Sequence, residues 1–245
     1  MRGGRERRRG AAGRLVLLAL LLTAGPALGE RRELSGVAHG YRALVYRPAA
    51  AAEHPAWPLL LYLHGAVERG DDLERAAATG PPYEIERGRS LPLVVVAPLL
   101  PAGERWEPER LRAVLDAVVA SEPVDRDRVY VSGKSLGGFG AWALATAFPT
   151  RFAALVPVSA AGDPETVCTL AGVRVWAFHN RDDPVVPVAR TQAAIDALRR
   201  CGGRARLTVY PASGHDAWSA TYAREDLWVW LLAQRRGAPP APAER

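Results

Sequence analysis

The stretch Gly133-Lys134-Ser135-Leu136-Gly137 decides the fold, because a strand pattern leads into it and a helix pattern follows it. Residues 128–132, Arg-Val-Tyr-Val-Ser, are typical of a strand, and residues 138–145 begin as a helix. A strand-to-helix turn around a serine is so tight that the positions two before and two after it need near-absent side chains, and glycine stands at both. The pattern predicts a serine hydroxyl raised above a sheet, where a substrate and a histidine can reach it.

Two later strand patterns end in partners for this serine. The apolar run 173–178 leads into a loop, 180–187, that holds Asp182 and Asp183. The run 206–211 leads to His215. A loop aspartate alone is usually a turn or cap residue, and a loop histidine alone is usually a surface residue. Here serine, acid and histidine follow the chain order of one class of serine hydrolases, and all lie past strand ends, where open α/β sheets bind ligands.

A fourth element lies after the apolar run 59–63, which ends in His64-Gly65-Ala66. Tetrahedral intermediates of acyl transfer need backbone N–H donors for their oxyanion. The residue after the nucleophile, Leu136, and a residue in the loop after an early strand, Ala66, are the expected donors. His64 could act as a base, but a histidine in such a His-Gly loop more often braces the backbone.

With these residues the chain resembles the phospholipase/carboxylesterase and dienelactone-hydrolase-like group of α/β-hydrolases, close to small secreted esterases often labelled predicted peptidases. The resemblance covers nearly all of the chain after residue 29, and it rests on residues 63–72, 133–142, 176–187 and 210–218. It implies that Ser135 is the nucleophile, Asp183 the acid and His215 the base. Asp183 is preferred over Asp182 because it directly precedes the Pro-Val-Val-Pro run, as the acid of the family does.

The resemblance also implies an α/β-hydrolase fold: a mainly parallel sheet with helices on both faces and no large lid or cap domain. The implied activity is carboxylesterase-like hydrolysis of an ester bond through an acyl-enzyme. Two positions depart from the family. Val67 stands where glycine is common and is expected to narrow the oxyanion loop, and Lys134 stands where an apolar or small residue is usual.

Three alternatives remain beside the esterase. A phosphate-binding loop around Gly133-Lys134-Ser135 would need a glycine at position 128, where arginine stands, so its backbone cradle is missing. A serine peptidase could use the same three residues, although the chain has no propeller or other gating domain. A catalytically idle hydrolase-like binding protein is the third alternative, and the intact serine, acid and histidine count against it.

Residues 1–29 have the pattern of a signal peptide, with six arginines, then the apolar run 15–22 and small residues at 27–29. An uncleaved anchor is the alternative. The whole chain has 32 basic and 26 acidic residues and a net charge of +6. Residues 1–29 hold six arginines and one glutamate, so the remainder has 26 basic and 25 acidic residues and a net charge of +1. We therefore expect an exported protein, secreted or periplasmic, without a nucleic-acid partner or stable membrane association after cleavage.

Residues 30–236 are long enough for one hydrolase domain, and 237–245 form a Pro/Ala-rich tail that is expected to be disordered. Strand-like runs alternate with helical patterns, which predicts a mainly parallel sheet covered on both faces. The predicted strands are 41–46, 59–63, 93–97, 129–132, 154–158, 173–178 and 207–210, and the predicted helices are 107–120, 188–200 and 224–234.

Aromatic residues suggest a substrate pocket for a small-molecule or polymer-borne ester. Trp106, Val186 and Trp218 are the candidates, and Trp218 is favoured because it lies three residues after His215. Trp142 is expected in the core, since it lies on the helix after the serine. No phosphate or dinucleotide fingerprint occurs, so no cofactor is predicted.

Cys168 and Cys201 are the only cysteines, an even number in a chain with an export signal. Each precedes one of two consecutive predicted strands, so both should lie at the edge of the sheet away from the catalytic residues. We expect a disulfide between them, with two free thiols as the alternative. Two cysteines without a nearby histidine do not make a metal site.

Overall fold

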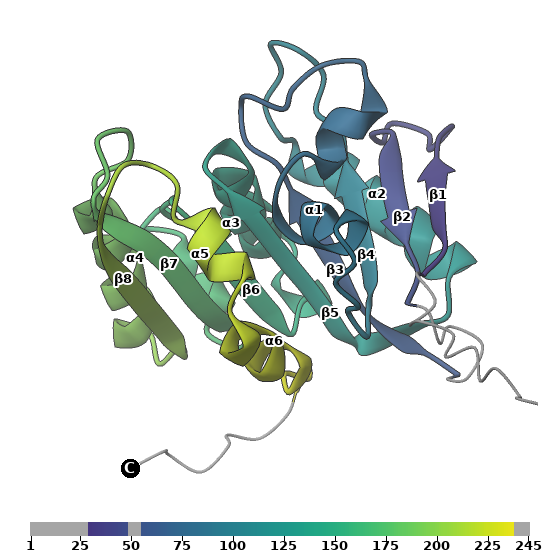
Figure 1. The fold of residues 1–245 in the computed structure, drawn as a ribbon. Helices are drawn as coiled ribbons and strands as arrows, with labels where there is room; N and C mark the ends of the chain where they lie inside the picture. The colour runs from purple at the N-terminus through teal and green to yellow at the C-terminus, as the bar shows by residue number, and fades with distance from the viewer. Residues whose placement is uncertain (1–28, 49–54, 238–245) are drawn as a thin grey trace, which may run out of the picture.

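A computed structural model describes residues 29–48 and 55–237 and contains a single eight-stranded sheet (Figure 1). The predicted signal peptide and tail lie outside these residues, apart from Gly29 and Gly237. The strands are ordered β1-β2-β4-β3-β5-β6-β7-β8. β3 to β8 are parallel, whereas β2 pairs antiparallel with both β1 and β4. The predicted mainly parallel α/β sheet is confirmed.

The strands span β1 (Arg31–Leu34), β2 (Ala43–Tyr46), β3 (Trp57–Leu63), β4 (Val94–Pro98), β5 (Val124–Lys134), β6 (Ala154–Val158), β7 (Arg174–Asp182) and β8 (Ala205–Ser213). The α-helices span α1 (Gly80–Glu86), α2 (Pro108–Ser121), α3 (Leu136–Ala147), α4 (Val188–Arg200), α5 (Trp218–Tyr222) and α6 (Glu225–Leu232). Short 3₁₀ turns include η2 (Leu73–Ala77) and η4 (Val167–Leu170).

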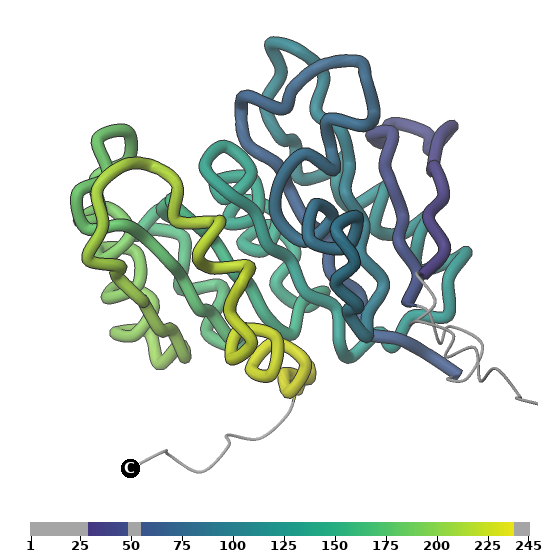
Figure 2. Tube along the Cα trace, viewed as in Figure 1, coloured from purple at the N-terminus to yellow at the C-terminus, as the bar shows by residue number. Residues whose placement is uncertain are grey.

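Helices cover both faces of the sheet, as the tube in Figure 2 also shows. Helices α2, α3 and α4 pack on one face, where they contribute buried residues to one core cluster. Helices α5 and α6 contribute to the cluster on the other face, and α1 packs against it through Ile85. Because both faces are covered, β3 and β4 are buried along their entire length.

The largest differences from the predicted elements concern edges and ends. β1 was not predicted, because its sequence Arg-Arg-Glu-Leu is polar and half exposed at the edge of the sheet. The predicted loop at 180–187 is partly strand, because β7 continues to Asp182 and pairs with β8 there. The closing helix predicted at 224–234 is shorter, and α5 precedes it as a separate helix.

The two cysteines form a disulfide, with their Cα atoms 5.5 Å apart. Cys168 lies in η4 before β7, and Cys201 ends α4 before β8. Since β7 and β8 are parallel neighbours, both cysteines lie at the N-terminal ends of these strands, as predicted. Both cysteines are exposed to solvent, so a reductant can reach them.

Reduction of this disulfide should lower the melting temperature. The bond joins residues 33 positions apart, and the chain-entropy model gives about 3–4 kcal/mol for a loop of that length. Thermal unfolding with and without reductant measures the effect, and a Cys168→Ala/Cys201→Ala variant, which should not respond to reductant, is the control. Activity at low temperature should persist, because neither sulfur lies at the edge that carries Ser135. An unchanged melting temperature after complete reduction would contradict this prediction.

Candidate active site

Ser135 occupies a strained turn between β5 and α3. Its φ is 50° and its ψ is −120°, a conformation that residues with a side chain rarely adopt. Such a conformation costs on the order of 1–3 kcal/mol and persists only where the surroundings enforce it. Here the Ser135 N–H donates to the carbonyl of Val158 (2.9 Å), and the Ser135 carbonyl accepts from the N–H of Phe139 (3.0 Å).

The two flanking glycines leave the space that this turn needs. A Cβ on Gly133 would lie 2.3 Å from the carbonyl oxygen of Gly137. A Cβ on Gly137 would lie 2.0 Å from the carbonyl oxygen of Leu63, at the end of β3. Neither position could therefore hold a side chain without moving the backbone, which is the requirement predicted from the sequence.

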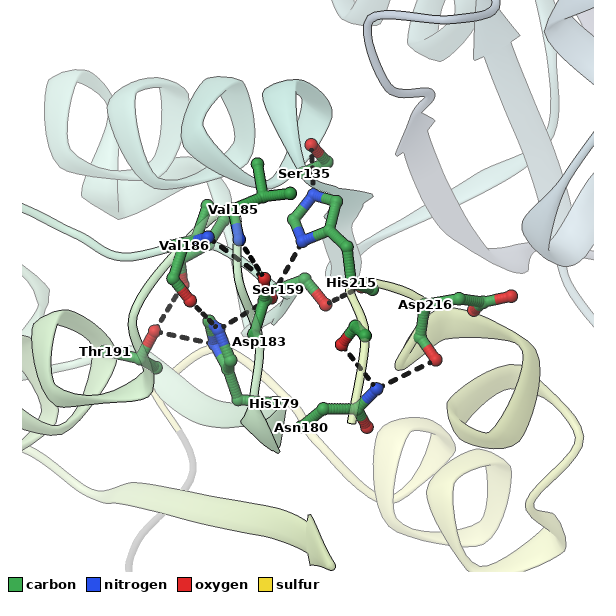
Figure 3. Close-up of polar contacts among 12 residues, drawn as sticks. Ser135, Ser159, His179, Asn180, Asp183, Val185, Val186, Thr191, His215 and Asp216 are labelled. Carbon is green, nitrogen blue, oxygen red and sulfur yellow. Dashed lines mark hydrogen bonds and ion pairs between the residues drawn. The ribbon is translucent and has the colours of Figure 1, made fainter. Parts of the chain in front are cut away.

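The structure brings Ser135, His215 and Asp183 together at the C-terminal edge of the sheet (Figure 3). His215 Nε2 lies 2.8 Å from Ser135 Oγ, and His215 Nδ1 lies 2.7 Å from Asp183 Oδ2. Since a carboxylate can only accept, Nδ1 carries the proton toward Asp183, and Nε2 of the neutral ring is free to accept from the serine hydroxyl. The arrangement can draw a proton from Ser135.

Asp183 is a buried carboxylate with several donors. Its Oδ1 accepts from the N–H groups of Val185 (2.8 Å) and Val186 (3.0 Å). Burial raises the pKa of Asp183, but the Val186 N–H, His215 and the Val185 N–H outweigh burial and leave the pKa lowered. The acid is therefore ionised at neutral pH. Its neighbour Asp182 is exposed.

A second histidine, His179, which was not predicted as a site residue, contacts the same carboxylate. Its Nε2 lies 2.8 Å from the carbonyl of Val186 and 3.2 Å from Asp183 Oδ2, while its Nδ1 lies 2.9 Å from Thr191 Oγ1. Burial lowers the pKa of His179 although Val186 and Asp183 raise it, so the ring is neutral at pH 7. With the proton of the neutral ring on Nε2, this N–H points to the Val186 carbonyl and Asp183, and Nδ1 faces the Thr191 hydroxyl. The only sequence signal was a histidine four positions before the acid.

The loop that carries His215 is held from two sides. Ser159 donates its hydroxyl to the carbonyl of His215 (2.8 Å). Asn180, in β7, donates from its side-chain amide to the carbonyls of Gly214 (3.0 Å) and Asp216 (3.1 Å). These bonds fix the backbone on both sides of the imidazole and thereby fix its distance from Ser135.

His64 braces the loop after β3. The Leu100 N–H donates to His64 Nε2 (3.0 Å), so the ring proton lies on Nδ1 and is donated to the Gly65 carbonyl (2.8 Å). Burial lowers the pKa of His64 to about 4, so the ring is neutral at pH 7. Both ring nitrogens are thus engaged by the backbone, which favours the bracing role over the alternative of a catalytic base.

The two predicted oxyanion donors belong to segments that pack together. Leu136 is the first residue of α3, where backbone N–H groups have no partner within the helix. Ala66 follows Gly65, and a Cβ on Gly65 would lie 3.6 Å from the carbonyl oxygen of Lys134. The loop therefore lies against the turn at Ser135, and the donor roles stay predictions. Val67 is 81% exposed, and its effect on the width of this loop stays a prediction.

A cavity of about 430 Å³ opens beside the serine and is lined by Arg105, Ser135, Leu136, Phe139, Val185, Val186 and Arg190. Of the three predicted pocket residues, only Val186 lines it. Trp106 lies instead in the core, 6% exposed, and donates its indole N–H to the carbonyl of His64 (3.2 Å). Trp218 stands edge-on to His215, with ring centroids 5.4 Å apart.

A second cavity of about 640 Å³ adjoins the first, and the two share Phe139 and Arg190. Its walls come from α3, α4 and the segment after β6. The lining is mostly apolar and consists of Phe139, Trp142, Ala143, Thr146, Ala147, Ala161, Gly162, Asp163, Pro164, Thr166, Arg190 and Ala193. Trp142 is 2% exposed and belongs mainly to the core, as expected.

Metal ligands do not cluster in the part of the chain that the structure describes, where no three His, Cys, Asp or Glu residues could hold an ion. Within residues 29–48 and 55–237, no helix has both the length and the apolar character to cross a membrane.

Known proteins resemble the chain at two levels. Residues 102–220 match the family described as esterase PHB depolymerase. A thermostable esterase of known structure is 27% identical, with a TM-score of 0.71 over 85% of this chain, and the match spans 64% of that esterase. No curated protein sequence matches significantly.

Two further solved structures share the fold at lower identity. The fluorophosphonate-binding serine hydrolase F of Staphylococcus aureus is 16% identical, with a TM-score of 0.66 over 84% of this chain and 99% of its own. A ferulic acid esterase is 17% identical, with a TM-score of 0.63 over 82% of this chain and 98% of its own. The sheet order and these two structures show the α/β-hydrolase fold, and the family match and the thermostable esterase support an esterase-like group within it.

Proposed function

We propose that the protein is a serine carboxylic-ester hydrolase in which Ser135 is the nucleophile, His215 the general base and acid, and Asp183 the residue that orients the imidazole. The observation that carries this proposal is the unbroken chain of hydrogen bonds from Ser135 Oγ through His215 to Asp183. The family match and the likeness to a thermostable esterase support an ester rather than another acyl substrate.

The reaction has two half-cycles. His215 Nε2 takes the Ser135 proton as Oγ attacks the ester carbonyl, and Asp183 stabilises the resulting imidazolium. The N–H groups of Ala66 and Leu136 hold the oxyanion, and one such donor contributes on the order of 3 kcal/mol in related sites. His215 then protonates the leaving alcohol. Water repeats the sequence on the acyl-enzyme and releases the acid.

His179 serves this chemistry without titrating. Because it is neutral, its single Nε2–H is shared between the Val186 carbonyl and Asp183 Oδ2 and adds no charge that would compete with His215. Its bond to the Val186 carbonyl also holds the turn whose N–H groups bind Asp183. Asp183 therefore keeps its charge and its direction.

The adjoining cavity is proposed to take the acyl chain, since it shares Phe139 and Arg190 with the cavity beside Ser135 and is mostly apolar. Esters of longer acids should then be preferred over acetates. A panel of p-nitrophenyl esters of graded chain length, run beside peptide amides, separates the esterase from a serine peptidase, and a complete lack of turnover would favour an idle binding protein.

The disulfide is consistent with export, and we propose a secreted or periplasmic location.

Ser135→Ala should lower kcat on the order of 10⁴- to 10⁶-fold, by analogy with triad deletions in serine hydrolases. The fold should persist, since alanine keeps the Cβ that the turn already accommodates. A serine-reactive phosphonate should label Ser135 alone, which mass spectrometry of peptides can verify. Ser121→Ala, at the end of α2, is the matched control and should keep full activity and labelling. Strong activity in Ser135→Ala would end this assignment.

Asp183→Asn should lower kcat on the order of 10⁴-fold, because the imidazole loses the carboxylate that selects its tautomer. Asp182→Asn is the matched neighbour and should be far milder, since Asp182 is exposed. Steady-state kinetics on one p-nitrophenyl ester compares the two. A larger loss of kcat in Asp182→Asn than in Asp183→Asn would identify Asp182 as the acid instead.

Ala143→Phe should fill the second cavity, because Ala143 is an exposed residue of its wall. The ratio of kcat/KM for octanoate to that for acetate should fall about tenfold, the scale of discrimination that a hydrophobic pocket provides. Ala120→Phe, the same change at an exposed position of α2, should leave the ratio unaltered. An unaltered ratio in Ala143→Phe would place the acyl chain elsewhere.

A further inference from the structure

Lys134, the single lysine of the chain, is buried directly before the proposed nucleophile. It is 4% exposed, and its Nζ lies 2.8 Å from Oε1 of Glu68, which is 6% exposed. Charged residues are rarely buried so completely, because the cost of removing both charges from water can exceed their mutual attraction. The pair therefore calls for an explanation other than stability.

The pair joins two segments that the proposed mechanism uses together. Lys134 ends β5 at the Ser135 turn, and Glu68 lies in the loop after β3 that carries Ala66. Both side chains lie against Gly65. A Cβ added to this glycine would lie 3.2 Å from Lys134 Cε and 3.3 Å from Glu68 Oε2. The ion pair therefore lies directly beside Gly65, the residue next to the proposed oxyanion donor.

The same ammonium also contacts the segment after His215. Lys134 Nζ lies 4.2 Å from the ring centroid of Trp218, within range of a cation–π interaction. The Trp218 ring in turn stands at 86° to the His215 ring. The Lys134 ammonium thus contacts Glu68 in the loop that carries Ala66 and also the Trp218 ring, which packs against the proposed base, His215.

Only one of the two carboxylate oxygens of Glu68, Oε1, pairs with Lys134. Its Oε2 is buried and has no hydrogen-bond partner among the residues that the structure describes. An unsatisfied buried acceptor is a cost that a purely stabilising ion pair would avoid. Other hydrogen bonds also hold this loop. The Arg69 guanidinium donates to the Ala66 carbonyl, and the Arg75 guanidinium donates to the carbonyls of Val67 and Glu68. None of these contacts reaches the turn at Ser135.

We propose that the Lys134–Glu68 pair is a positioning device: it fixes the loop that carries the Ala66 N–H against the Ser135 turn, and through Trp218 it holds the His215 ring in place. Neither residue touches the reacting atoms. The inference rests on the proposed function, and it assigns a role to the lysine that departs from the family pattern.

The test replaces both charges at once. Lys134→Met and Glu68→Met alone each leave an unpaired buried charge and should lower the melting temperature strongly, whereas the double variant should keep it, since apolar pairs of similar volume can replace buried ion pairs. The double variant should nevertheless lose kcat about 30-fold while KM stays within about threefold, because an interaction realised only in the transition state is weakened. Its affinity for a trifluoromethyl ketone, which mimics the tetrahedral intermediate, should fall by the same factor as kcat/KM.

Glu122→Gln is the matched control. Glu122 is also a buried carboxylate, held by Arg32 and Arg47 at the far side of the sheet. Its loss should lower the melting temperature and leave kcat, KM and inhibitor affinity unchanged. This control separates the positioning of the site from general loss of stability.

Trp218→Leu tests the other contact of Lys134 at a half-buried surface position, where folding is not at risk. It should lower kcat about tenfold, and Trp218→Phe, which keeps an aromatic ring, should restore most of it. Wild-type kcat and ketone affinity in the double variant, or wild-type kcat in Trp218→Leu, would overturn the inference while leaving the esterase proposal intact. Absence of ester hydrolysis in the wild-type protein would instead refute the proposed function.

Discussion

The left-handed backbone of Ser135 is the constraint on which the site depends. A residue with a side chain adopts this conformation only when its surroundings enforce it, and here β5, α3 and the Val158 carbonyl do so. Gly133 and Gly137 are required because the ends of β3 and α3 approach within the space of a Cβ. The turn therefore couples the direction of the serine hydroxyl to the packing of the central strands.

The parallel sheet then determines which residues can meet this serine. His215 is 80 positions from Ser135 and Asp183 is 32 positions from His215, yet all three follow strands whose C-terminal ends share one edge. A buried Asp183 carboxylate is tolerated there because two N–H groups and two histidines surround it. His179 is neutral and adds a hydrogen-bond donor without a positive charge. The Asp183 carboxylate therefore remains available to stabilise a positive charge that forms on His215.

The sequence predicted the parts of this site that depend on local patterns. The helix predicted at 188–200 is α4, and the space around Ser135 does require Gly133 and Gly137. Asp183 and His215 lie within hydrogen-bond distance of each other, and their roles stay predictions. His179, by contrast, contacts Asp183 through a side-chain direction that a strand pattern does not specify. Trp106 was misplaced for the same reason, because the pattern could not show that its indole points toward His64 in the core. The edge strand β1 was missed because its polar residues carry no alternation of burial strong enough to detect.

Stability and reactivity are located at opposite edges of the sheet. The disulfide and the buried Glu122 ion pairs lie at the edge where the parallel strands begin. The disulfide joins the segments before β7 and β8, and Glu122 pairs with Arg32 in β1 and with Arg47 after β2. The C-terminal edge carries costs instead: a positive φ at Ser135, a buried Asp183 and an unsatisfied Glu68 oxygen. Asp183 lies within the loop of residues 168–201 that the disulfide closes. The bond therefore restrains the segment that carries the proposed acid, although neither sulfur lies at the edge with Ser135.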